Sequence, residues 1–229
     1  MLKERVEFNA LNDYELYHND FKLFSEATKS HLKITGVFEV YWCTLVFKNW
    51  KEGVNHTGCD NLDSIFNELH QDVSSSYYLA SMGLYRTSNM HLRSLIELSF
   101  QLLYFFDHPI EFEKWKVGEF VIKHEKLKDY LKEYPAFSDN ALKGKINTLV
   151  EQISKLWKDF SKHIHAESLV YFQTQKVSVS NNGFDLADFG KWKSSFVRLV
   201  KKINELFMLF FSEKYKLFPS TNRDLLTLS

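Results

Sequence analysis

The chain has 229 residues and a formal net charge of zero, so it can form one domain with a large core. Only three prolines and eight glycines interrupt it, and 16% of its residues are aromatic, which favours long helices over a strand-rich fold. Cys43 and Cys59 form neither a disulfide framework nor a zinc motif. The first residues, MLKERVEF, lack the apolar core of a signal peptide, and no apolar run could span a bilayer. We therefore expect a cytoplasmic protein with no membrane partner, no metal and no cofactor.

Charge is unevenly spread along the chain. Residues 1–110 hold 9 Lys and Arg against 14 Asp and Glu, a difference of −5, whereas residues 111–229 hold 20 against 15, a difference of +5. A basic second half can seat an anionic partner, or let two copies dock head to tail. Ordinary variation of surface charge is the alternative interpretation.

The first half of the chain reads as successive helices. Residues 10–32 have apolar side chains at intervals of three and four, as in an amphipathic helix. Residues 37–50 are apolar and β-branched enough to be ambiguous, and a buried helix is favoured. A loop over 53–60 leads to a short helix through 62–69. The longest helical pattern then covers residues 74–107.

The second half continues as helices with one exception. Pro109 can open the next helix, and the pattern up to Tyr134 has one solvated face. A helix follows through 142–160, and a final one covers 186–216. Between them, residues 169–184 alternate and end in Asn-Asn-Gly, which predicts a β-hairpin.

These elements predict an all-α fold, a multi-helix bundle with an added N-terminal helical layer and one small β-hairpin. We expect a single domain over residues 1–229. Within it, residues 1–52 would form the added layer, 60–216 the bundle and 217–229 a tail.

A polar stripe runs along the pattern at 74–107. Arg86, Asn89, Arg93 and Glu97 advance by three or four positions and share one face of a helix. Arg93 and Glu97 are spaced for an ion pair, which we expect to be largely buried. The pair either fixes how two helices cross, or makes Arg93 an anchor for a phosphate that Glu97 orients.

Two histidines near a helix end are the next candidates. His163 and His165 in SKHIHAE could act as acid and base near neutral pH. On a helix, side chains two positions apart point about 200° away from each other, so a shared zinc ion is not expected. A role in the core or at the helix end is the alternative to catalysis.

The final helix carries cations between aromatic residues. Lys191, Lys193 and Arg198 lie among Trp192 and Phe196, with Lys201 and Lys202 beyond them. Such a helix could follow a nucleic-acid backbone while bases stack on the rings. The other interpretation is that the rings are core and the lysines are a solvated face.

The segment YRTSNMHLRSLIELSFQLLYF, followed by LWKDFSKHIHA and a closing amphipathic helix, resembles HEPN-related helical proteins over about residues 75–210. That family includes bacterial toxins and phage-defence proteins, and its ribonucleases use an R-x4-6-H motif near the start of a late helix, completed across a homodimer. Arg86 and His91 match the string but lie in an early helix, so Arg93 and His165 are equally good candidates.

The resemblance implies an RNA-binding protein or a metal-independent ribonuclease in bacterial defence. Its catalytic candidates are Arg93, His165, Glu97 and His163, and its RNA-binding candidates are Arg86, Lys191, Lys193 and Arg198. The alternative is a non-catalytic scaffold or regulatory subunit of a defence complex, docking through aromatic-rich helices or the tail at 221–229. Expected partners are RNA, a second copy of the chain, or a protein from the same operon.

Overall fold

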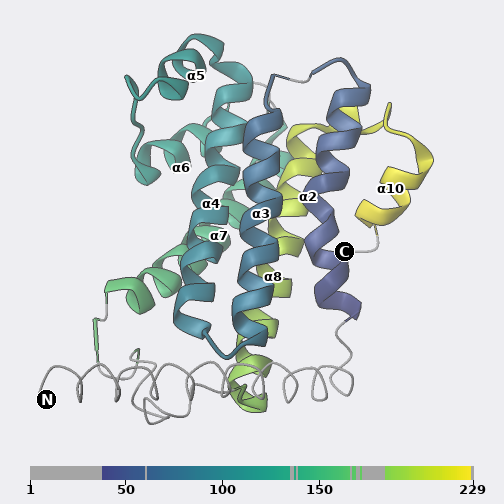
Figure 1. The fold of residues 1–229 in the computed structure, drawn as a ribbon. Helices are drawn as coiled ribbons and strands as arrows, with labels where there is room; N and C mark the ends of the chain where they lie inside the picture. Colours follow the sequence, from purple (N-terminus) through teal and green to yellow (C-terminus); the bar gives the residue numbers. More distant parts are fainter. Residues whose placement is uncertain are drawn as a thin grey trace, which may run out of the picture.

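The computed structural model describes residues 38–59, 61–134, 137, 139–165, 167–168, 171 and 184–227 (Figure 1). Within these ranges every long element is a helix and there is no strand, which confirms the all-α prediction for this part of the chain. The helices are α2 (Phe38–His56), α3 (Asp63–Ser81), α4 (Tyr85–Asp107), α5 (Pro109–Lys116), α6 (His124–Lys132), α7 (Asn140–His165), α8 (Leu186–Phe210), α9 (Ser212–Tyr215) and α10 (Ser220–Thr227).

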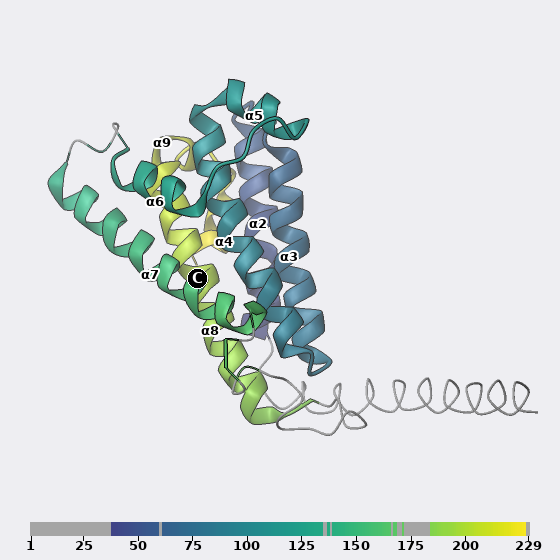
Figure 2. The same cartoon turned by 90° about the vertical axis from the view of Figure 1, so that its left-hand side faces the viewer.

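The long helices form two layers. Helices α2, α3 and α4 run alternately up and down in one layer, while α7 and α8 lie behind it (Figures 1 and 2). Helix α3 contacts both α2 and α4, and α8 contacts α2, α4 and α7. The apolar faces of both layers are therefore buried against each other, which is the arrangement that amphipathic helices require.

The break between α3 and α4 differs from the prediction of one helix over 74–107. Helix α3 ends at Ser81 and α4 begins at Tyr85. Gly83 lies between them with φ of 74°, in the left-handed region where glycine has no steric cost. The reversal explains how one long apolar pattern supplies two antiparallel neighbours.

Trp50 of α2 organises the upper part of the core. Its ring is fully buried, with ring centroids 5.6 Å from Phe207 and 5.4 Å from Phe218. Its indole nitrogen donates to Oδ1 of Asn204 at 2.7 Å, and Nδ2 of Asn204 donates to the carbonyl of Leu226 at 2.8 Å. These bonds satisfy buried polar groups while joining α2, α8 and α10.

The limits of the bundle differ from those predicted. Helix α2 belongs to the bundle rather than to an added layer, because Val40, Cys43 and Phe47 are fully buried. Residues 1–37, the rest of the predicted layer, lie outside the described residues, as does the predicted hairpin at 169–184 apart from Tyr171 and Phe184.

The C-terminal segment is part of the bundle too. Helix α10 packs on α2, and Leu226 is fully buried. Nδ2 of Asn222 donates to Asn49 at 3.1 Å and to Glu52 at 3.2 Å, both on α2. Residues 220–227 are therefore packed against the bundle rather than extending from it as a free tail.

No helix in the described part of the chain is long and apolar enough to cross a bilayer.

Gly53→Ala should destabilise the protein. A methyl group at this position of α2 would overlap the Phe218 ring, so the ring and the segment that leads to α10 would have to move. We expect the free energy of unfolding, measured by chemical denaturation, to fall by about 1–3 kcal/mol.

Gly144→Ala in α7 is the matched control, since no described atom outside the local helix backbone and the two chain neighbours lies within 4 Å of the added methyl group. It should raise the free energy of unfolding by up to about 1 kcal/mol through helix propensity. Equal effects of the two substitutions would contradict the close contact at Gly53.

Candidate functional site

The polar stripe of α4 faces α7. Nε of Arg93 donates to Oε1 of Glu97 at 3.1 Å, so the predicted ion pair is present. The Trp157 indole of α7 donates to the same oxygen at 2.8 Å, and the Arg93 guanidinium carbon lies 4.9 Å from the centroid of that ring. The side chains of Arg93 and Glu97 are 23% and 36% exposed, so the pair is partly buried rather than largely buried as expected. The pair joins two helices at the surface.

A stacked imidazole adjoins this cluster. His124, the first residue of α6, lies nearly parallel to Trp157 at 4.3 Å and to Phe100 at 5.3 Å between ring centroids. Both ring nitrogens are buried, and neither has a hydrogen-bond partner in the described structure. Burial lowers the pKa of His124, and Arg93 and Lys128 act in the same direction while Glu125 and Glu97 oppose it. The sandwich therefore favours the neutral ring.

Arg86 is bound to the end of α7. Its Nε donates to the carbonyl of His163 at 3.0 Å and its terminal nitrogen to that of Ile164 at 3.1 Å. The last carbonyls of a helix have no partner within it and carry partial negative charge. Arg86 thus caps α7, which leaves its fork of donors directed at protein rather than at RNA.

The two histidines of α7 do not join Arg93. His163 is half-buried, its ring centroid lies 5.0 Å from that of Tyr171, and burial lowers its pKa. His165 ends the helix and is exposed. Arg93 of α4 lies beside Trp157 of α7. Trp157 precedes His165 by eight positions, or about 12 Å along the axis of α7. The four predicted catalytic residues are therefore at two places rather than in one cleft.

The R-x4-H string does not form a joint site either. His91 turns to α3, where its Nδ1 lies 2.7 Å from Oδ1 of the buried Asp72. Arg86 turns to α7. Both residues are on α4, but their side chains contact different helices.

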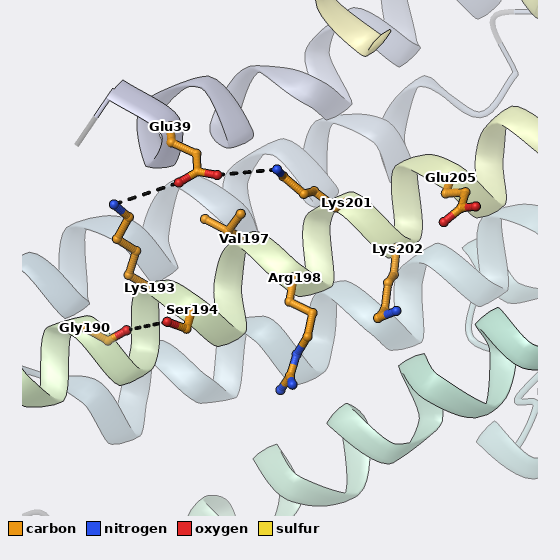
Figure 3. A pocket seen from close by; sticks show the side chains of 9 residues that line it. All are labelled: Glu39, Gly190, Lys193, Ser194, Val197, Arg198, Lys201, Lys202 and Glu205. Atoms are coloured by element: carbon orange, nitrogen blue, oxygen red, sulfur yellow. Dashed lines mark hydrogen bonds and ion pairs between the residues drawn. The ribbon is translucent and has the colours of Figure 1, made fainter. Parts of the chain in front are cut away.

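The cations of the final helix gather along a groove. It has a volume of about 780 Å³ and follows the outer face of α8, which supplies most of its wall (Figure 3). Positions along α8 recur at intervals of three and four, so they share one face of the helix. The lining residues are Glu39, Gly190, Lys193, Ser194, Val197, Arg198, Lys201, Lys202 and Glu205. This set is called the α8 groove below.

Two of the predicted RNA-binding residues on α8 line the groove and one does not. Lys193 and Arg198 are in it, whereas Lys191 lies outside and pairs with Asp188 at 2.9 Å. Trp192 and Phe196 are buried, which confirms the interpretation of these rings as core and leaves neither ring available for stacking with bases. The groove offers charge to a backbone rather than rings to bases.

The α8 groove has four cations and two carboxylates. Glu39 of α2 contacts Lys193 at 3.9 Å and Lys201 at 3.4 Å, while Glu205 pairs with Lys145 at 3.0 Å. Lys202 donates to Gln152 of α7. Arg198 is exposed, and it has no ionic or hydrogen-bonding partner among the residues that the structure describes. The groove is therefore net positive.

Cys43 lies near the α8 groove. Burial raises the pKa of its thiol to about 12, so this cysteine adds no negative charge to the groove. In the ranges that the structure describes, no group of three His, Cys, Asp or Glu side chains is placed to hold a metal ion.

Three contributors were missed in the sequence: Glu39, Trp157 and His124. Each acts through a partner more than thirty residues away or on another helix, so spacing gave no signal for it. The excess of Lys and Arg in residues 111–229 indicated the half of the chain that contains α8, but it did not identify the residues of the groove.

In a comparison with protein families, the model of DUF5677, a family of unknown function, matches residues 64–216. No curated protein and no solved structure matches the chain.

The stability of the protein should fall as the pH drops below about 6.5, the ordinary pKa of histidine. Because the pKa of His124 is lowered in the folded state, the unfolded chain binds a proton there that the folded protein does not. The contribution is constant above pH 6.5 and is lost progressively toward the lowered pKa.

His124→Phe keeps the stack and removes the proton site, so its free energy of unfolding should change less between pH 7 and pH 5 than that of wild type. His163, whose pKa is also lowered, is present in both proteins and cancels. His165→Phe is the control and should behave as wild type, because His165 is exposed. Equal pH dependence in all three proteins would contradict the account.

Proposed function

The chain belongs to DUF5677, a family of unknown function, and we propose from its geometry that it binds the phosphate backbone of RNA in the α8 groove. The observation that carries the proposal is the alignment of Lys193, Arg198, Lys201 and Lys202 along one face of a helix. Neutralising phosphates with Lys and Arg is the main source of affinity for nucleic acids.

The size and the chemistry of the groove fit a strand. Gly190 and Glu205 are 15 residues apart on α8, so the groove follows about 22 Å of helix. Contacts of lysines with phosphates carry no sequence information. With Trp192 and Phe196 buried, we expect binding that depends strongly on salt and weakly on sequence.

The choice of RNA comes from the HEPN resemblance, which also suggests a role in bacterial defence. The same resemblance suggests ribonuclease activity, but binding has the better support. Arg93 contacts Glu97 and Trp157, Arg86 caps α7, and His165 is exposed at the end of α7.

A docking role has support from a different surface. Ile110, Val117 and Val121 are 69%, 71% and 86% exposed within one short segment that includes α5. Large exposed apolar side chains are typical of interaction sites where they lie side by side. A subunit that binds a second copy or an operon partner through residues 110–121 is therefore the second candidate function.

Arg198→Ala/Lys202→Ala should weaken binding of a labelled single-stranded RNA by about tenfold or more at low salt, because two phosphate contacts are lost. Fluorescence anisotropy measures the affinity, with single-stranded DNA compared in parallel. Lys191→Ala is the control, since Lys191 is on the same helix but outside the groove. Absence of RNA binding by wild type at low salt, or an undiminished affinity in the double variant, would contradict the proposal.

We expect the bound RNA to stay intact in EDTA, because the candidate catalytic residues lie apart. Gel electrophoresis of the RNA after incubation checks this. Cleavage in EDTA that is lost in His165→Ala at an unchanged melting temperature would instead establish the metal-independent ribonuclease. The His163→Ala variant distinguishes the contribution of His163 from that of His165. The ring of His163 is half-buried and also contacts Tyr171.

A further inference from the structure

One carboxylate in the α8 groove contacts two of its lysines at once. Oε1 of Glu39 lies 3.4 Å from Nζ of Lys201, and Oε2 lies 3.9 Å from Nζ of Lys193. Figure 3 shows the carboxylate between the two ammonium groups, reaching across from α2 to α8. An anion held by one lysine on each oxygen is the arrangement that a phosphodiester, with its two unbridged oxygens, can also adopt.

The two lysines converge on this point from a distance. They are eight positions apart on α8, about 12 Å along the helix axis. Their side chains could extend separately into solvent, yet both lean toward the same anion. The position of the carboxylate thus marks where the groove holds a single negative charge.

The position of Glu39 allows an anionic ligand to displace its carboxylate from the two lysines. Its side chain is 46% exposed, and an ion pair of such exposure is weak and sensitive to salt. Helix α2 does not need it for docking, because the adjacent Val40 and the next turn's Cys43 are fully buried against the core. The carboxylate can therefore leave the lysines while its helix stays in place.

We infer that Lys193 and Lys201 form a phosphate subsite, and that Glu39 occupies it in the free protein. A phosphate of RNA must take the place of the carboxylate to use the full groove. Glu39 then sets the affinity of the groove by competing with the ligand. The inference rests on the proposed function and names how the same site is regulated.

Glu39→Gln keeps the shape of the side chain and removes its charge. We expect it to bind single-stranded RNA about three- to fivefold more tightly than wild type at low salt, the range that a half-exposed ion pair allows. The gain should shrink as salt screens the site. Melting temperatures measured alongside show that the fold is kept.

Glu205→Gln is the matched control. Glu205 lines the same groove and its substitution changes net charge equally, but its partner is Lys145, outside the groove. Its gain should be clearly smaller than that of Glu39→Gln. Equal gains would mean that only total charge matters and would overturn the subsite.

A double-mutant cycle gives the sharpest test. In a Lys201→Ala background, Glu39→Gln should lose most of its gain, because the lysine that the carboxylate blocks is gone. An undiminished gain there, or no gain in the single variant while wild type binds RNA, overturns the subsite and leaves the proposed function standing. Absence of RNA binding by every variant overturns both.

Discussion

The inward face of α8 determines where the cations of this protein can lie. Phe196, Val200 and Ile203 are fully buried against the neighbouring helices, and burial of this much apolar surface fixes the rotation of α8 about its axis. Once that rotation is set, residues such as Arg198 and Lys201 must face outward. The α8 groove is a consequence of core packing, so a ligand there meets cations whose backbone is held rigidly.

The arginines of α4 contribute to the bundle in a different way. Arg86 ties the start of α4 to the end of α7 through two carbonyls, and Arg93 ties its middle to Trp157 and Glu97. Charge-assisted hydrogen bonds of this kind are stronger than neutral ones. Arg86, whose donors are held by two carbonyls, is a poor phosphate ligand, and this supports placing the proposed RNA contacts on α8.

Local patterns were sufficient for the helices and insufficient for the site. The spacing of apolar residues in α8 is long and regular, so the helix and its core face could be predicted. The α3–α4 break was missed because one glycine, Gly83, interrupts an otherwise continuous pattern. Lys193 and Arg198 were found because they share a helix, whereas Glu39 reaches Lys193 from more than 150 positions away, a contact that only the tertiary fold creates. Arg86 was assigned to RNA because its charge can be read from sequence but its carbonyl partners cannot.

Lysine footprinting tests the central claim most directly. Acylation of the protein with an amine-reactive reagent, with and without single-stranded RNA, reports by mass spectrometry which lysines the ligand covers. The account predicts that RNA protects Lys193, Lys201 and Lys202, while Lys191 on the same helix reacts equally in both samples. Bound RNA that leaves the groove lysines as reactive as before, or that protects lysines of α5 instead, would contradict it.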